Sequence, residues 1–412
     1  MIKNEILITE LNNQKMFFAL IDNRLEYLEV FDEESLTGRL FVGRVENIVS
    51  NIDSAFVRFM DDLNGYLSLK DVCAECVLNR DFLQNPKLRN GDLVLVQVVN
   101  DALKTKLPKL TCKLSLGGKY CAITLGEKGV GCSRKLPEEK RRDLIYSVKD
   151  YLSGKLEYNA IFNCGIILRT DAGNPDVEIS DIIGEIKDLS EAFKQMLDKS
   201  KCLSACQEVI FNEAASKFDD VIKRFVHVVN CFNKEQILIG TDDKKVYDRL
   251  LLNKDYSDSE LYLLKYFDIE TENARPLSVI YGLENKLEDC TKKKVWLKSG
   301  GYLVIEQTEA LNVIDVNTGK SISGKKNIAM KLNQEAMEES MRQIRLRNLS
   351  GMILIDFINM KSKDENNHLI DNIKAMTKLD PVNINFVDIT GLGIIELTRK
   401  KTGKSLIEVL TK

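Results

Sequence analysis

LNVIDVN at residues 311–317 and GMILID at residues 351–356 are two apolar segments typical of buried β-strands. Each segment carries a carboxylate at or near its end, Asp315 in the first and Asp356 in the second. Between them, residues 327–347 place apolar side chains at helical spacing, which predicts a β-α-β unit. Because strands joined by such a crossover run parallel, we expect both aspartates at the same, carboxyl edge of one sheet.

Two interpretations of this aspartate pair are open from the residues alone. If the strands are neighbours, the oxygens of Asp315 and Asp356 lie within reach of one hydrated divalent ion, as in Mg²⁺ sites for phosphoryl transfer. Asn317, two residues after Asp315, offers a further polar contact to the ion, its water or a substrate phosphate. The alternative is that each aspartate caps the turn or helix that follows its strand.

The composition narrows the classes of function. A length of 412 residues predicts two to four domains, and the formal charge of −3 excludes a globally basic nucleic-acid coat protein. No segment approaches the ~18 apolar residues of a membrane span, and Glu5 and Glu10 interrupt the region where an export signal needs an apolar core. We therefore expect a cytoplasmic protein whose ten cysteines are reduced thiols.

Few residues are available for histidine or thiolate chemistry. His227 lies in FVHVVN, which we predict as a core strand, and His368 follows a polar segment typical of a surface helix. The cysteine pairs Cys73/Cys76 and Cys202/Cys206 lack the flanking features of a zinc ribbon, so we expect them to bind no metal. Carboxylates and a metal ion are the chemical groups that this composition favours.

Five short β-patterns between residues 38 and 116 predict a small barrel of the oligonucleotide-binding type. The patterns are LFVGRVENIV, SAFVRFM, GYLSL, DLVLVQVV and KLTCKLSL. Phe56 and Tyr66 lie on the second and third patterns, the strands on which such barrels stack bases, and Lys106 lies nearby for phosphate contacts. Burial in the barrel core is the alternative for both aromatic side chains.

Residues 119–208 mix helical and β-patterns and contain one candidate phosphate site. Arg169 and Thr170 end the β-pattern NAIFNCGIILRT, and a basic run, CSRK, lies at 132–135. A bidentate guanidinium with a hydroxyl beside it suits a terminal phosphomonoester. A solvated charged surface is the alternative.

Four segments together resemble the ribonuclease E/G family: SAFVRF…GYLSL, TEALNVIDVNTG, LRLRNLSGMILIDFINM and GLGIIELTRKK. The likeness covers nearly the whole chain in the segment order of the family. It implies an α/β multi-domain (α+β) fold in which an S1/OB-type β-barrel is inserted in a ribonuclease-H-like piece. The implied parts are that piece at 1–36 and 209–288, the S1 RNA-binding barrel at 37–118, a 5′-sensor at 119–208 and a DNase-I-like α/β catalytic domain at 289–412.

The resemblance also implies a function. A member of the family would be a Mg²⁺-dependent endoribonuclease that cleaves single-stranded, A/U-rich RNA, is stimulated by a 5′-monophosphate, and leaves 5′-phosphate and 3′-hydroxyl ends. Its implied partners are ribosomal RNA precursors and messenger RNA, in processing and decay, and not DNA. By the family motif, the Mg²⁺-holding residues are Asp315 and Asp356 with Asn317 beside them, the RNA-binding residues are Phe56, Tyr66 and Lys106, and the 5′-phosphate-binding residues are Arg169 and Thr170.

Three features depart from the family pattern. Asn359 stands where the family usually has Asp, which favours the alternative of an RNA-binding protein with weak or lost nuclease activity. No CPxC zinc-link follows SLIEVLTK, so we expect any homodimer to be zinc-independent. The long disordered arm of the E branch does not occur within these 412 residues, so we expect the sequence to be closer to the G branch.

Overall fold

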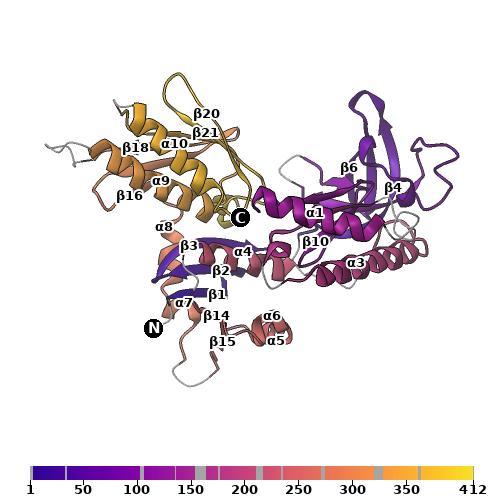
Figure 1. Ribbon diagram of the computed structural model, residues 1–412, viewed down its shortest axis with the longest axis horizontal. Helices are drawn as coiled ribbons and strands as arrows, with labels where there is room; N and C mark the ends of the chain where they lie inside the picture. The colour runs from indigo at the N-terminus through magenta and orange to yellow at the C-terminus, as the bar shows by residue number, and fades with distance from the viewer. Residues whose placement is uncertain are drawn as a thin grey trace. The chain divides into compact units, whose positions relative to one another are not determined.

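The computed structural model of the chain describes residues 3–32, 35–102, 106–134, 136–153, 164–174, 177–209, 217–232, 235–270, 274–319, 328–360 and 363–411. Two compact units divide the chain, one made of residues 1–33 and 217–412 and the other of residues 34–216 (Figure 1). The chain is thus a mixed α/β protein in which the second unit is inserted into the first. The finer division into five domains stays a prediction.

A closed five-stranded barrel forms part of the inserted unit. Its strands pair in the order β4–β5–β6–β8–β7, and β7 pairs again with β4. They are β4 (Leu40–Val49), β5 (Ser54–Met60), β6 (Leu63–Ser68), β8 (Lys109–Thr111) and β7 (Leu93–Asn100). Gly43 permits a close strand approach, since a Cβ at this position would lie 2.4 Å from Cγ1 of Val57. The predicted barrel is confirmed as a closed five-stranded barrel.

The last of the five β-patterns, KLTCKLSL, is divided between two sheets, where we predicted one strand. β8 closes the barrel, whereas β9 (Ser115–Gly117) belongs to a four-stranded sheet with the order β11-β12-β10-β9. The chain turns between them, where the Thr111 hydroxyl accepts a hydrogen bond of 3.0 Å from the Lys113 N–H. The other strands of this sheet are β10 (Cys121–Leu125), β11 (Val130–Cys132) and β12 (Cys164–Leu168).

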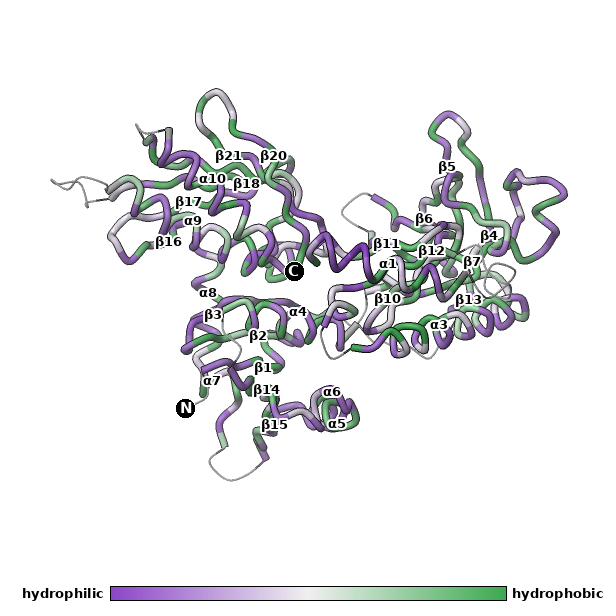
Figure 2. Tube along the Cα trace, in the orientation of Figure 1, coloured by the Kyte–Doolittle hydropathy of each residue, from purple (hydrophilic) through white to green (hydrophobic). Residues whose placement is uncertain are grey.

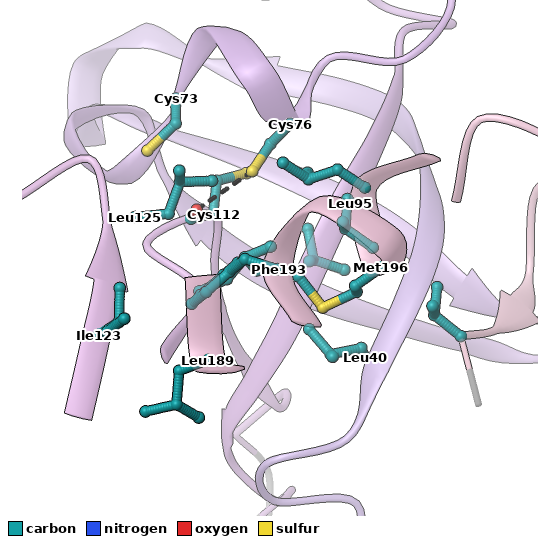
Figure 3. Packing of buried hydrophobic residues seen from close by; sticks show 14 of the residues in the cluster. Leu40, Cys73, Cys76, Leu95, Cys112, Ile123, Leu125, Leu189, Phe193 and Met196 are labelled. Atoms are coloured by element: carbon teal, nitrogen blue, oxygen red, sulfur yellow. Dashed lines mark hydrogen bonds between the residues drawn. The ribbon is translucent and has the colours of Figure 1, made fainter. Parts of the chain in front are cut away.

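Two helices pack on the four-stranded sheet, α1 (Glu138–Ser153) on β11 and α3 (Ile179–Ser200) on β10. Figure 2 shows hydrophobic and hydrophilic residues alternating along α3, as expected for a helix with one buried face. Phe193 and Met196 of α3 join the same core as Leu40 and Leu95 of the barrel strands (Figure 3). The inserted unit therefore has one continuous hydrophobic core.

The first sheet of the other unit has the strand order β15-β14-β1-β2-β3. Its strands are β1 (Asn4–Leu11), β2 (Gln14–Ile21), β3 (Arg24–Phe31), β14 (Ile237–Thr241) and β15 (Tyr262–Tyr266). The hairpin turns contain Asn12–Asn13 and Asp22–Asn23, all with positive φ, which is the conformation of a two-residue turn between twisted strands.

Helix α4 (Lys217–Phe232) contains the segment FVHVVN, so our prediction of a strand there was wrong. The valines of this segment suggested a β-pattern, but Phe218, Ile222, Phe225 and Val229 are buried at helical spacing. Phe225 packs on β2, with its ring centroid 5.6 Å from that of Phe17. A long apolar stripe therefore outweighed the local β-propensity.

A six-stranded sheet with the order β16-β17-β18-β19-β21-β20 completes this unit, and we call it the catalytic sheet after the role that the family resemblance implies for residues 289–412. Its strands are β16 (Lys294–Trp296), β17 (Tyr302–Gln307), β18 (Leu311–Asn317), β19 (Gly351–Asp356), β21 (Ile395–Arg399) and β20 (Ile384–Ile389). Helices α9 (Ile328–Leu346) and α10 (Lys363–Thr377) share a core with one face of the sheet. β18 comes before α9 in the chain and β19 after it, and the two strands pair in parallel, as predicted.

The remaining elements are short. They are β13 (Gln207–Glu208), α5 (Lys244–Leu252), α6 (Lys254–Ser257), α7 (Leu277–Ile280), α8 (Leu283–Asp289), α11 (Leu406–Leu410) and the 3₁₀ turns Ser50–Ile52, Leu69–Asp71, Ala74–Cys76 and Thr170–Gly173. None of the helices described is long and apolar enough to cross a membrane.

Candidate active site

Asp315 and Asp356 lie opposite each other on neighbouring parallel strands. The β18–β19 register pairs Leu311 with Met352 and continues to Asp315 and Asp356, which places the two aspartate Cα atoms about 4.8 Å apart. The side chains of a registered pair leave the same face of a sheet. Asp315 is half-buried and Asp356 is exposed, so both carboxylates lie together on a face that solvent reaches.

Asn317 is part of the same arrangement. Its side chain lies on the same face as Asp315, two residues earlier on β18, and its Nδ2 donates a hydrogen bond of 2.8 Å to Oδ2 of Asp315. This bond fixes the orientation of the Asp315 carboxylate. The structure therefore brings together the three residues that the sequence analysis placed at the metal site.

Two buried asparagines that the sequence analysis did not identify hold the strands of this site. Nδ2 of Asn312 donates to the backbone carbonyls of Ser350 and Met352, at 2.9 and 3.2 Å, where β19 begins. Asn333 of α9 donates to the Ile358 carbonyl at 2.7 Å and accepts from the Ile358 N–H at 3.0 Å, just after β19 ends. For Asn312 the sequence carries one signal, an amide inside the apolar segment LNVIDV, whereas Asn333 stands among polar residues and no local pattern marks it.

The donor set decides which metal would fit. Among the residues that the structure describes, no group of three or more His, Cys, Asp or Glu side chains is arranged to hold a metal ion. The site therefore offers two carboxylates and one amide. Mg²⁺ suits this set, because it is usually bound through one or two carboxylates and keeps several waters or substrate phosphates as its other ligands.

Phe56 and Tyr66 form a cross-strand pair on the barrel. The β5–β6 register places them directly opposite each other, and Tyr66 is in turn registered with Lys109 on β8. Both aromatic side chains are half-buried, and the adjacent Ala55 is buried, so the pair faces away from the barrel core. Lys106 is exposed and precedes β8 by a few residues.

Arg169 and Thr170 follow β12, as the sequence analysis expected. The guanidinium of Arg169 lies against the backbone of Gly117, where a Cβ would be only 2.2 Å from Nη2. The Thr170 hydroxyl is exposed and lies 2.9 Å from Oγ of Ser133, within the CSRK run. Lys135, the last residue of that run, is outside the described residues.

The two histidines lie on helices, not on the strands that carry the aspartate pair. His227 is half-buried in α4, and His368 is exposed on α10 beside Asn372, whose Nδ2 is 3.1 Å from Nδ1 of the imidazole. Neither residue belongs to a strand of the catalytic sheet.

Cys73 and Cys76 lie close to Cys112 in the inserted unit (Figure 3). The Cys76 thiol donates to the Cys112 carbonyl at 3.2 Å, and all ten cysteines of the chain are free thiols. A hydrogen bond from Cys76 lowers the pKa of the Cys73 thiol, whereas burial raises the pKa of Cys76. The pair thus has one thiol that ionises more readily and one that resists ionisation.

The amino-acid sequence is similar to those of known ribonucleases. A model of the Ribonuclease E/G family matches residues 115–402. Ribonuclease G of Escherichia coli (strain K12) is 28% identical over 397 residues, which cover 93% of this chain and 76% of that protein. Ribonuclease G of Haemophilus influenzae is 28% identical over 395 residues with the same coverage, and Ribonuclease E of Nostoc sp. is 27% identical over 412 residues, 98% of this chain and 57% of that protein.

Proposed function

The chain belongs to the Ribonuclease E/G family and is an endoribonuclease, and we propose that it hydrolyses single-stranded, A/U-rich RNA in a Mg²⁺-dependent reaction at Asp315 and Asp356. The observation that carries the proposal is the register of β18 and β19, which sets the two carboxylates side by side on an accessible face. The products would carry 5′-phosphate and 3′-hydroxyl ends. Ribosomal RNA precursors and messenger RNA would be the substrates.

Asp315 and Asp356 would hold the ion, with the Asn317 amide beside them. When bound there, Mg²⁺ lowers the pKa of a coordinated water and stabilises negative charge on the phosphate. The hydrogen bond from Asn317 keeps the Asp315 carboxylate oriented before the ion arrives, which reduces the reorganisation that binding requires. A mechanism through the ribose 2′-hydroxyl would need a general base such as histidine, and neither histidine is on the catalytic sheet.

The inserted unit would bind the substrate. Phe56 and Tyr66 are proposed to stack unpaired bases, and Lys106 to contact a phosphate. Arg169 and the Thr170 hydroxyl would receive a 5′-monophosphate, and 5′-monophosphorylated RNA would then react faster than 5′-hydroxyl RNA. Their half-buried or exposed positions support these roles.

The test is a cleavage assay with a 5′-monophosphorylated A/U-rich oligonucleotide, with Mg²⁺ or with a chelator, followed by identification of both product ends. We expect cleavage only with the divalent ion, and products with 5′-phosphate and 3′-hydroxyl ends. Products with 2′,3′-cyclic phosphate ends, or cleavage at an equal rate with the chelator, would contradict the proposal. The Asp315→Asn variant, purified in the same way, controls for contaminating nucleases.

Asn359 supports a second candidate function, an RNA-binding protein whose nuclease activity is weak. Its side chain is exposed three residues after Asp356, and its Oδ1 would lie 3.6 Å from a Cβ at Gly393. An aspartate at this position would add one negative charge near the proposed ion. If Asn359→Asp raises the cleavage rate more than tenfold at limiting Mg²⁺, the weak-nuclease function is favoured; an unchanged rate favours the full endoribonuclease.

A further inference from the structure

A row of aromatic side chains crosses the catalytic sheet beside the aspartate pair. The β16–β17 register pairs Trp296 with Tyr302, and the β17–β18 register pairs Tyr302 with Asn317. Asn317 is the residue that donates a hydrogen bond to Asp315. The aromatic row therefore ends at the proposed active site, on the same face of the sheet as the two carboxylates.

The indole of Trp296 is held in place while most of its surface stays exposed. Trp296 is 64% exposed, although burial of a large aromatic side chain would stabilise the fold. Tyr302 is half-buried and contacts the indole edge-on, with ring centroids 5.2 Å apart at 61°. This contact orients the indole and leaves it accessible to a planar ligand.

Lys294 adds a positive charge to this pair. Its ammonium lies 4.1 Å from the ring centroid of Trp296 and 3.6 Å from that of Tyr302. The neighbouring lysines Lys292 and Lys293 are paired with Asp289 and Glu306. Within the described part of the chain no carboxylate pairs with Lys294, so its charge is available to an anionic ligand.

We propose that Trp296, Tyr302 and Lys294 form a nucleobase-stacking site for the RNA strand next to the aspartate pair. A base of the unpaired strand stacks on the indole, and a neighbouring phosphate contacts the Lys294 ammonium. Stacking tolerates every base, because each has a π-face, and a cation beside it suits the phosphate backbone. The proposal rests on single-stranded RNA being the substrate, as proposed above.

The distance between Trp296 and the aspartate pair suits a base-stacking site. Trp296 lies two strands away from Asp315 and one row along the sheet, which corresponds to about 12 Å between the Cα atoms. A nucleotide near the scissile bond would therefore reach the indole. The stacking site would hold the strand on the catalytic sheet and would add to the affinity that the barrel supplies.

Trp296 is the only tryptophan of the chain, so its fluorescence reports this site alone. We would titrate the full chain, in the presence of a chelator to prevent cleavage, with an oligouridine and with an abasic oligonucleotide of equal length and charge. We expect saturable quenching of the emission by the oligouridine and little change with the abasic strand. Equal changes with both strands, or no change while fluorescence anisotropy of labelled RNA shows binding, would overturn the stacking site.

Substitutions provide an independent readout. Trp296→Ala should raise KM about tenfold with a smaller change in kcat, whereas Trp296→Phe should retain most of the parental KM. Tyr146→Ala is the matched control, because Tyr146 is 73% exposed on α1 and belongs to neither proposed site. Lys294→Met should weaken RNA binding and reduce its salt dependence, and Lys292→Met should change neither.

The outcomes separate this proposal from the function on which it rests. A parent that binds and quenches with RNA but does not cleave it contradicts the proposed reaction and leaves the stacking site intact. A parent that cleaves RNA, together with a Trp296→Ala variant of unchanged KM, contradicts the stacking site alone. A change in sedimentation coefficient on Trp296→Ala would instead assign the exposed indole to a protein contact and overturn the proposal.

Discussion

The outer face of the barrel and the open face of the catalytic sheet carry similar aromatic pairs. On the barrel, Phe56 and Tyr66 are registered across two antiparallel strands, and Lys109 follows on the next strand. Both aromatic residues are half-buried, with their core-facing neighbours fully buried. The catalytic sheet also combines two registered aromatic residues with a lysine: Trp296 pairs with Tyr302, and Lys294 precedes Trp296 on the same strand.

In the registered rows that the structure describes, only the catalytic sheet, and not the barrel, carries carboxylates beside its aromatic pair. The catalytic sheet carries Asp315 and Asp356 in the row next to its aromatic pair, whereas the row through Phe56, Tyr66 and Lys109 contains no acidic residue. Antiparallel pairing is sufficient to build a stacking surface. The proposed metal site depends on a parallel pair of strands, because there the carboxyl ends of both strands meet at one edge. The comparison fits our proposal that both faces bind RNA and that only the face with the carboxylates carries out the chemistry.

Asp315→Asn should separate binding from chemistry most strongly. The substitution keeps the shape of the side chain but removes a charge from the proposed ion site, so cleavage should fall by a factor of roughly 10³ or more, equivalent to about 4 kcal/mol. RNA affinity should change less than about twofold, because the barrel is intact. Single-turnover cleavage and fluorescence anisotropy measure the two quantities. A variant that cleaves at close to the parental rate would show that the carboxylate pair is not the reaction centre.

Asp92→Asn should destabilise the barrel without touching the catalytic sheet. Asp92 is buried and accepts two hydrogen bonds of 2.8 Å from the Arg80 guanidinium and one of 2.8 Å from the Arg89 N–H. Removing this charge leaves Arg80 without its ionic partner, so the unfolding free energy of the inserted unit should fall by about 3 kcal/mol at pH 7. Urea unfolding followed by far-UV circular dichroism measures the loss.

The effect of Asp92→Asn should depend on pH. Burial raises the pKa of Asp92, but the hydrogen bonds from Arg80 and the Arg89 N–H outweigh it and hold the pKa below its ordinary value. A carboxyl whose pKa is lower in the folded state stabilises the fold above its ordinary pKa of about 3.9, and this stabilisation is lost as the pH falls through the folded-state value. Parent and variant should therefore converge in acid. The emission of Trp296, in the other unit, should show the same transition in both proteins.

The sequence alone predicts both the aspartate pair of the catalytic sheet and the strands that carry the aromatic residues of the barrel. The apolar runs before Asp315 and Asp356, with a helical pattern between them, are sufficient to predict parallel strands that end in carboxylates. The alternation around Phe56 and Tyr66 predicts barrel strands, and the structure resolves the open question by facing both residues away from the core. Local patterns are reliable here because a single periodicity determines the face on which each side chain lies.

Features that depend on tertiary pairing were not predictable. The row of Trp296, Tyr302 and Asn317 exists only because two antiparallel registers coincide, and nothing in the individual strands specifies that register. Asn333 holds the backbone after β19 through contacts across 25 residues of sequence. FVHVVN was assigned to the wrong element because its valines favour strands locally, while the buried stripe that makes it helical extends over the whole of α4.

Tyr66→Ala should lower RNA affinity by about tenfold with little change in the rate of the bound complex, since one stacked base contributes about 1–3 kcal/mol. Tyr66→Phe keeps the ring and should restore most of the affinity. Anisotropy titrations and single-turnover rates at saturating protein measure the two quantities. If Tyr66→Ala lowered the cleavage rate at saturating protein and left the RNA affinity unchanged, the barrel face would not act in binding alone, and the proposed separation of binding from catalysis would be wrong.

Arg169→Ala should have the smallest effect and should alter only the discrimination between RNA ends. Charged hydrogen bonds to a phosphate are worth up to about 3 kcal/mol, but Arg169 is only half-buried, and solvent and salt reduce this to about 1 kcal/mol. The ratio of kcat/KM for 5′-monophosphorylated over 5′-hydroxyl RNA should therefore fall about fivefold, through slower cleavage of the monophosphorylated strand alone. Arg142→Ala is the matched control, because Arg142 is exposed and its guanidinium pairs with Glu138 on the same helix. An unchanged ratio in Arg169→Ala, or an equal fall in Arg142→Ala, would mean that this part of the inserted unit does not recognise the 5′ end.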